Sequence, residues 1–169
     1  MTLDLQILAD RMAIEERLNL YAHYIDTGQA TRVPDEIFTI DADIMLGGLP
    51  VFGRAALAEM LAGMMSAMEG TSHNITNVMI DVRGDEAHAY SRIVGWHWLA
   101  RRDADPFRPA DLTAVGAYQD HFRRTADGWR ISQRRGMNYG TGIGLGTIGD
   151  ELKPVFQGMW GRVHQWPVP

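Results

Sequence analysis

The segment Tyr21–Gly28 places a carboxylate, that of Asp26, at the end of a predicted helix, where it faces the negative end of the helix dipole. This mismatch costs roughly 0.3 to 1 kcal/mol unless another group compensates for it. Burial and this placement would both raise the proton affinity of Asp26, and a base that removes a proton requires such tuning. In the alternative interpretation, Asp26 caps a turn or lies in solvent.

His73 is a second candidate for proton transfer, because it stands where helical sequence gives way to the first long predicted strand. An imidazole titrates near neutral pH and can act as a general base. If Val78, Ile80 and Val82 face the core, however, strict alternation places His73 on the opposite face of the strand. A functional His73 therefore requires a β-bulge or a twist between it and Val78, and without one it is a structural residue.

Other patterns in the chain are typical of cofactor or nucleophile sites but lack their supporting context. Gly144–Gly149 reads G-x-G-x-x-G, the dinucleotide fingerprint, yet only twenty residues follow it and none after Glu151 is acidic. The six histidines form no H-x-H or H-E-x-x-H pattern, and the chain has neither a cysteine nor a G-x-S-x-G motif. We therefore expect no cofactor, no metal ion, and no serine or cysteine nucleophile.

The chain has 169 residues, of which 46% are hydrophobic and 22% charged, values typical of one globular domain. Its formal charge of -5 does not favour binding to the phosphate backbone of a nucleic acid or to an anionic membrane surface. No window approaches the ~18 uncharged apolar residues of a membrane span, and acidic residues stand where a signal peptide requires positive charge. We expect a cytoplasmic protein, with a single domain over residues 1–169, that binds neither nucleic acid nor a membrane.

Hydrophobic spacing predicts helices first and strands afterwards. The helices are expected over three segments with apolar residues at helical spacing: Asp4–Asp26, Pro34–Phe38 and Leu57–Met68. After a short strand at Asp43–Leu46, alternating and aromatic-rich segments predict four long antiparallel strands: Asn74–Val82, Ala87–Leu99, Leu112–Arg124 and Trp129–Asn138. This segregated order predicts an α+β fold in which the sheet curls over the helices as a cone with an apolar interior.

An apolar interior of this kind suits a small hydrophobic ligand as partner. We expect thioether and aromatic side chains to line it: Met64, Met68, Trp96, Trp98, Tyr118 and Met137. Core packing explains each of these residues equally well. The glycine-rich loop and apolar tail helix over 140–169 are expected to cover the sheet, the cavity mouth or a subunit interface, so we also expect a homo-oligomer, either a dimer or a trimer.

Several segments of the chain carry a family pattern: Arg11–Leu18, Tyr21, Asp26, Ser72–Asn74, Asp127–Arg134 and Met137–Tyr139. With the predicted order of helices and strands, these segments resemble the SnoaL-like branch of the nuclear transport factor 2-like superfamily. The resemblance covers nearly the whole chain and implies a cone-shaped α+β barrel, in which a strongly curved antiparallel sheet wraps around three N-terminal helices. It also adds Asn138 to the candidate substrate-binding residues.

Within this branch, the sequence is similar to hexachlorocyclohexane dehydrochlorinase and to the bile-acid and scytalone dehydratases. The resemblance implies that Asp26 and His73 form a dyad that removes a carbon-bound proton, while Arg134 assists the departing group. The lysine of the dehydrochlorinase is matched here by Tyr21, whose hydroxyl can protonate a leaving hydroxyl. The resemblance therefore favours a cofactor-independent lyase that dehydrates a small hydrophobic, hydroxylated molecule.

Three alternatives stay open on the sequence alone. The same dyad can serve a carbon–carbon lyase that releases formaldehyde from an aryl diol, and it can serve a double-bond isomerase. The fold also hosts many small-molecule binding proteins without catalytic activity, because fold does not determine function.

Overall fold

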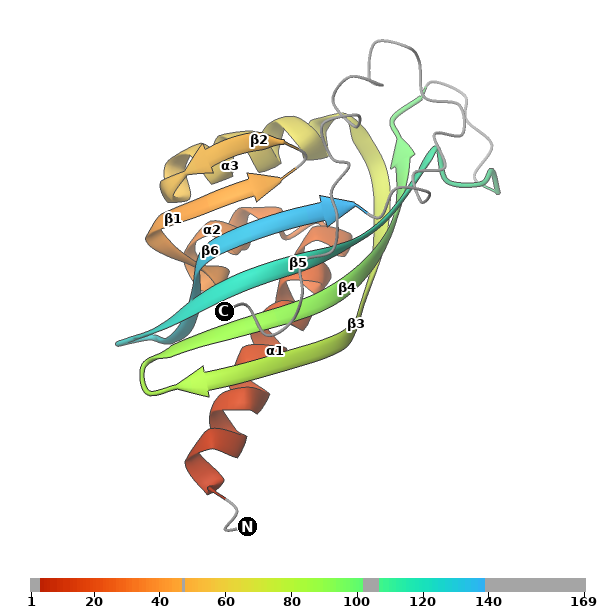
Figure 1. The fold of residues 1–169 in the computed structure, drawn as a ribbon. Coiled ribbons are helices and arrows are strands. Elements are labelled where there is room, and N and C mark those ends of the chain that lie inside the picture. The colour runs from red at the N-terminus through yellow and green to blue at the C-terminus, as the bar shows by residue number, and fades with distance from the viewer. Residues whose placement is uncertain (1–3, 47, 102–106, 139–169) are drawn as a thin grey trace.

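The computed structural model describes residues 4–46, 48–101 and 107–138, and only the backbone of Met137 and Asn138 within the last range. In this part of the chain, three α-helices and a short 3-10 helix, η1, accompany six strands (Figure 1). The elements follow in the order α1 (Leu5–Asp26), η1 (Ala30–Arg32), α2 (Val33–Ile37), β1 (Phe38–Leu46), β2 (Leu49–Phe52), α3 (Gly53–Ser66), β3 (Met68–Arg83), β4 (Glu86–Leu99), β5 (Leu112–Thr125) and β6 (Gly128–Asn138). None of the described helices is both long and apolar enough to span a membrane. The predicted loop and tail over 140–169 lie outside the described residues.

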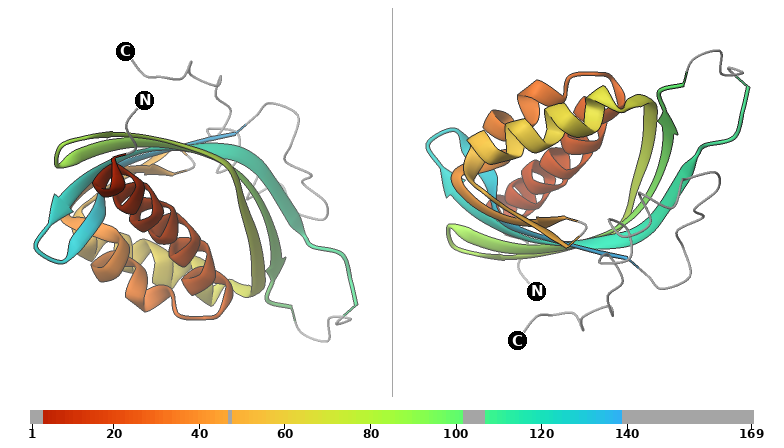
Figure 2. Two further views of the ribbon diagram at one scale, coloured as in Figure 1. Left: turned by 90° about the horizontal axis from the view of Figure 1, so that it is seen from below. Right: turned by 90° about the horizontal axis from the view of Figure 1, so that it is seen from above.

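The strands form one mixed sheet in the order β2-β1-β6-β5-β4-β3. Neighbouring strands are antiparallel, except for β1 and β6, which are parallel. The sheet is strongly curved and open, and the helices lie in its concave side, as the views from below and above show (Figure 2). The predicted α+β cone is confirmed, with the refinement that one strand pair is parallel and that the barrel is not closed.

Helix α1 is a long helix with clearly defined ends. Asp4 begins it as the N-cap, since its carboxylate accepts hydrogen bonds from the backbone amides of Gln6 and Ile7 at 2.9 and 3.3 Å. Gly28 follows its end with a φ of 72°, a conformation that glycine adopts without strain. The buried face of the helix packs into the core and includes Ile14, Leu18, Tyr21 and Ile25.

Strand β3 contains the bulge that a functional His73 requires. Thr76 pairs with Arg92 and Met79 pairs with Tyr90, so two residues of β3 stand opposite one residue of β4. One of the two, Asn77, has a φ of 51°, a left-handed conformation that asparagine tolerates better than most residues. Because the bulge reverses the alternation, His73 lies on the same concave face as Val78, Ile80 and Val82, which pack against the core.

A buried carboxylate on α1 attaches the first half of this helix to the sheet through contacts of Asp10 with Arg124 and Trp129. Arg124 donates two hydrogen bonds of 2.7 Å to the buried carboxylate of Asp10, and Nε1 of Trp129 donates a third of 3.1 Å. The hydrogen bonds from Arg124 are the main cause that lowers the pKa of Asp10 from 3.8 to about 2. The ionised carboxylate therefore stabilises the fold at neutral pH, and this contribution declines as the pH falls below 3.8 toward 2.

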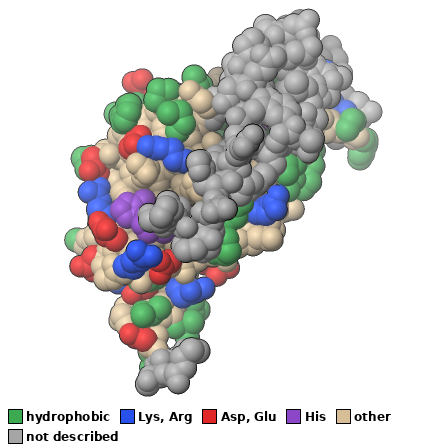
Figure 3. Space-filling view, in the orientation of Figure 1, with side chains coloured by type: hydrophobic (Ala, Val, Ile, Leu, Met, Phe, Trp, Pro, Cys, Tyr) green, Lys and Arg blue, Asp and Glu red, His purple; other side chains and the backbone are tan. Residues whose placement is uncertain are grey.

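The convex face of the sheet, opposite the helices, carries a cross-strand pair of histidines. His88 on β4 and His121 on β5 are register partners, and their rings stack with centroids 4.6 Å apart. Histidine side chains are visible on this face among acidic and basic residues (Figure 3). Burial, followed by the neighbouring His88, lowers the pKa of His121. This pair lies on the other face of the sheet from His73.

Candidate active site

Asp26, the last residue of α1, contacts His73 of β3. Oδ1 of Asp26 lies 2.6 Å from Nδ1 of His73, and Oδ2 accepts a 2.7 Å hydrogen bond from the backbone amide of His73. The hydroxyl of Thr71 donates a further bond of 2.8 Å to Oδ1. These three donors compensate for the unfavourable position of the carboxylate at the end of the helix. Because an ionised carboxylate only accepts hydrogen bonds, Nδ1 of a neutral His73 carries the proton and Nε2 keeps a free lone pair.

Gly95 makes room for the imidazole ring of His73. The two residues are partners in the register of β3 and β4. A Cβ atom on Gly95 would lie 2.8 Å from Cδ2 and 3.0 Å from Nε2 of His73, too close for a real contact. The ring therefore lies directly against the backbone of β4, and its side chain is only 9% exposed. Asp26 holds the ring from one side and β4 limits it from the other.

His73 borders a small cavity between the helices and the concave face of the sheet, with a volume of about 140 Å³. We call this space the inner cavity. Small residues on the sheet leave it open, namely Gly95, Ala114, Ala117 and Gly136. Among the described lining residues, polar side-chain groups come from four: Tyr21, His73, His97 and Tyr118. A mostly apolar lining with a few polar groups suits a small hydrophobic ligand.

Tyr21 and Tyr118 contribute the two phenols of the inner cavity, and their rings meet edge to face with centroids 5.9 Å apart. Arg134 packs against both rings, with its guanidinium carbon 4.3 and 4.1 Å from their centroids. Its Nε and Nη2 donate hydrogen bonds of 2.7 and 2.8 Å to the buried carboxylate of Asp120. Burial, more than the neighbouring Tyr21, raises the pKa of Tyr118 well above its usual value, so the Tyr118 hydroxyl stays protonated.

Arg134, which is predicted to assist the departing group, packs against the two rings and is not among the described residues that line the inner cavity. Its side chain is 0% exposed. Within the described part of the chain, its Nη1 has no hydrogen-bond partner. The positive charge of Arg134 therefore acts on the cavity through the rings of Tyr21 and Tyr118, with which it makes cation–π contacts.

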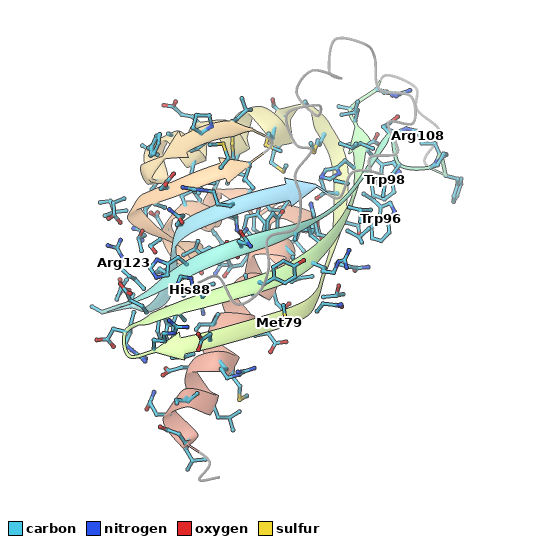
Figure 4. All side chains as sticks on the ribbon, in the orientation of Figure 1. Met79, His88, Trp96, Trp98, Arg108 and Arg123 are labelled. Atoms are coloured by element: carbon cyan, nitrogen blue, oxygen red, sulfur yellow. The ribbon has the colours of Figure 1, made fainter. Side chains whose placement is uncertain are left out.

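Trp96 and Trp98 lie outside the inner cavity, which corrects the prediction that they line it. Side chains alternate along β4, and Gly95 and His97 border the cavity, so the two indoles project from the opposite face. They point to the outside of the sheet near Arg108 (Figure 4). Nε1 of Trp98 donates a hydrogen bond of 3.2 Å to the carbonyl of Arg108, a contact with the connection between β4 and β5.

The other predicted lining residues fall into two groups. Met64, Met68 and Tyr118 border the inner cavity. Met137 and Asn138 belong to β6, but their side chains lie outside the described part of the structure.

His97 is a cavity residue that is not among the predicted site residues. Its ring meets that of His73 edge to face, with centroids 5.1 Å apart, and its buried Nδ1 has no hydrogen-bond partner among the described residues. Burial, followed by the neighbouring His73, lowers the pKa of His97 from 6.5 to about 4, so the ring is neutral near pH 7. Alternation could have found it, because a strand with Ala87, Ala89 and Ile93 on its inner face also places His97 there.

The side chains around the inner cavity offer proton transfer. His73 presents the lone pair of Nε2 on a ring that the Asp26 carboxylate orients through Nδ1. Tyr21 and Tyr118 present hydroxyl protons. In the described part of the chain, no group of three histidine, aspartate or glutamate side chains is arranged to hold a metal ion.

Three helices in the concave side of a curved, open six-stranded sheet define the cystatin-like fold of the nuclear transport factor 2-like proteins. Within this class, a sequence profile of the SnoaL-like domain matches residues 6–135. The chain belongs to the SnoaL-like family. The matched range includes the dyad, both cavity tyrosines and Arg134.

Solved structures of this fold include enzymes and proteins with proposed activities. A protein from Novosphingobium aromaticivorans, proposed to be an aromatic ring hydroxylase, is 27% identical with a TM-score of 0.72, over 88% of this chain and 97% of that chain. Another from the same bacterium, proposed to be a scytalone dehydratase, is 24% identical with a TM-score of 0.69, over 78% and 85% of the two chains. Hexachlorocyclohexane dehydrochlorinase from Novosphingobium barchaimii is 19% identical with a TM-score of 0.67, over 80% and 90%. A comparison with curated proteins finds no match.

Proposed function

We propose that this protein is a cofactor-independent lyase that eliminates water, or another small group, from a compact hydrophobic molecule. The substrate class is an aromatic or alicyclic compound that carries a hydroxyl group. The observation that carries the proposal is the 2.6 Å contact between Asp26 and His73 at the edge of an apolar cavity that also contains two phenols. A general base and a general acid in one apolar space are the two groups that an elimination needs.

In this proposal His73 is the general base. Nδ1–H of His73 donates a hydrogen bond to the Asp26 carboxylate, so Nε2 is the atom that takes a proton from a substrate carbon. The imidazolium that forms stays next to the Asp26 carboxylate, which stabilises its positive charge. Asp26 therefore orients the imidazole and stabilises its positive charge, whereas His73 accepts the proton from the substrate.

Tyr21 is the proposed general acid. When the carbon–hydrogen bond breaks, its electron pair forms a carbon–carbon double bond, the carbon–oxygen bond breaks, and the leaving oxygen takes the proton of the Tyr21 hydroxyl. Water then departs, and the imidazolium of His73 returns its proton to the tyrosinate. Arg134, whose guanidinium lies 4.3 Å from the Tyr21 ring, stabilises the transient negative charge on that ring.

The comparisons support this direction of chemistry. Two of the structures with this fold have names, dehydratase and dehydrochlorinase, that denote elimination reactions. The resemblance to the dehydrochlorinase gives a lysine at the position of Tyr21, and a phenol proton suits a leaving hydroxyl better than a halide.

A double-bond isomerase is the second candidate, and His97 favours it. A neutral imidazole beside His73 gives the cavity a second nitrogen that can exchange protons with substrate carbons. Release of formaldehyde from an aryl diol uses the same dyad, and a binding protein needs only the cavity. Product analysis separates these functions.

The test is incubation of the protein with a set of hydroxylated aromatic and alicyclic compounds, followed by mass analysis of the products. A product lighter by one water supports dehydration, one lighter by formaldehyde indicates carbon–carbon cleavage, and unchanged mass with a shifted double bond indicates isomerisation. Asp26→Asn is expected to lose the reaction, whereas Asp41→Asn, at an exposed carboxylate outside the cavity, is the matched control that keeps it. Binding without any product across the set would contradict the lyase proposal and favour a binding protein.

A further inference from the structure

A second space lies beside the inner cavity, between the end of α1, helix α3 and the start of β3. We call it the outer crevice, and its volume is about 330 Å³. Its lining includes Asp26 and Thr71, whereas His73 borders the inner cavity. The dyad therefore lies in the boundary between the two spaces, with the carboxylate on one side and the imidazole on the other.

The inner cavity alone is small for a ligand site. Its volume of about 140 Å³ lies below the range of ~300–1,000 Å³ that is typical of small-molecule pockets, whereas the outer crevice falls inside that range. A ligand confined to the inner cavity is limited to about one ring. A larger ligand needs space on both sides of the boundary.

Four residues line both spaces and form the wall between them: Ile25, Leu61, Met65 and Met68. Ile25 and Leu61 are buried in the hydrophobic core and are held there by their neighbours. Met65 and Met68 are only partly buried. A methionine side chain is unbranched, with three rotatable bonds, and adapts to the shape beside it. The methionine pair is therefore the more adaptable part of the wall.

The chemistry of the outer crevice limits what it can bind. Its charged lining groups are the carboxylates of Asp26 and Glu69, and no lysine or arginine lines it within the described residues. Glu69 is paired with Arg108 at 2.9 Å, so the Asp26 carboxylate is the lining charge that would repel an anionic group there. Ala58 and Ala62 of α3 instead offer a small, apolar surface to an uncharged group.

We propose that the inner cavity and the outer crevice are one divided binding site, with Met65 and Met68 as the partition that sets the length of the substrate. The substrate is then an elongated, uncharged molecule with one ring in the inner cavity and a second apolar group in the outer crevice. The position of the reacting carbon, beside His73 at the boundary, rests on the function proposed above. The divided site itself is tested by binding alone.

Calorimetric titration with three probes tests the proposal: phenol, 4-phenylphenol and 4'-hydroxybiphenyl-4-carboxylate. The wild type is expected to bind 4-phenylphenol roughly tenfold more tightly than phenol, because a second ring is buried, and to bind the carboxylate probe more weakly than 4-phenylphenol. Ala62→Phe fills the outer crevice from α3 and is expected to abolish most of this gain. Ala56→Phe, at an exposed position of α3 that lines neither space, is the matched control and is expected to keep the gain.

Met65→Ala removes part of the partition and is expected to increase the preference for 4-phenylphenol over phenol. Equal wild-type affinities for phenol and 4-phenylphenol, an undiminished gain in Ala62→Phe, or no binding of any probe would each overturn the divided site. None of these results depends on catalysis. The lyase proposal fails separately, when Asp26→Asn turns over substrate as fast as the wild type.

Discussion

The position of His73 depends on Gly95, so Gly95→Ala tests the proposed site by a steric change alone. The added Cβ would lie 2.8 Å from Cδ2 of His73 and 3.0 Å from both Nε2 of His73 and Cε1 of His97, whereas ordinary contact begins at 3.4 Å. The imidazole ring must therefore shift by about half an ångström or more, while Thr71 and the backbone of β3 hold the Asp26 carboxylate in place. Since a misplacement of ~1 Å can reduce a rate about 10²-fold, we expect kcat/KM to fall roughly 10- to 100-fold.

The assay is kcat/KM for a compound that the wild type dehydrates, together with urea unfolding of the same samples. Overpacking at Gly95→Ala is expected to lower the free energy of unfolding by about 1 to 3 kcal/mol. Gly63→Ala is the matched control, because its added Cβ would have no atom of the described residues within 4 Å apart from its chain neighbours and the backbone of its own helix. This control should keep full activity and gain about 0.5–1 kcal/mol of stability. A folded Gly95→Ala variant with wild-type activity would refute the steric argument.

Three further predictions concern the polar groups around the inner cavity. Tyr21→Phe should slow elimination about 10²-fold or more, as followed by product formation over time, and an undiminished rate would remove Tyr21 as the acid. Arg134→Met leaves Asp120 buried without its partner, so urea unfolding should show a loss of roughly 3–5 kcal/mol, against about 0–1 kcal/mol for Arg123→Met at an exposed ion pair; equal losses would contradict this difference. The ring of His97 should titrate in NMR spectra with a midpoint at about pH 4. Because this pKa lies below the usual 6.5, the stability that the neutral ring contributes is complete above pH 6.5 and is lost as the pH falls toward 4, and a midpoint near 6.5 would show that the ring is solvated.

Local signals were sufficient to predict helix α1 and its ends. The Asp4 cap and the positive φ of Gly28 are properties of single residues, and the apolar spacing between them is a property of the helix itself. Strand β2 was not predicted, because Gly48 and Pro50 are typical of a turn and the strand exists only through its pairing with β1.

The bulge in β3 shows where reasoning from alternation stops. Alternation along the strand indicates that a functional His73 requires a change of register. Nothing in the sequence pattern, however, identifies Asn77 as the residue at which the register changes. A non-glycine residue with a positive φ is maintained by the strands around it, and that information is not local.

The two tryptophans of β4 show a different limit. Large aromatic residues favour burial, so Trp96 and Trp98 were assigned to the cavity, yet the polar His97 between them lies there instead. Hydrophobicity alone favours the tryptophan face of β4 as the inner face, whereas in the folded structure the face with Gly95 and His97 lines the cavity. The homo-oligomer, the cytoplasmic location and the role of residues 140–169 stay predictions.

The central claim is that Asp26 and His73 act together as a base, and Asp26→Asn tests it most directly. Asparagine has nearly the same size as aspartate, but its neutral amide cannot stabilise an imidazolium ion as a carboxylate does. The measurement is the single-turnover rate at saturating substrate, with the dissociation constant determined on the same protein. We expect the rate to fall about 10²- to 10⁴-fold while the dissociation constant is unchanged. An unchanged rate in a variant that binds substrate normally would contradict the account.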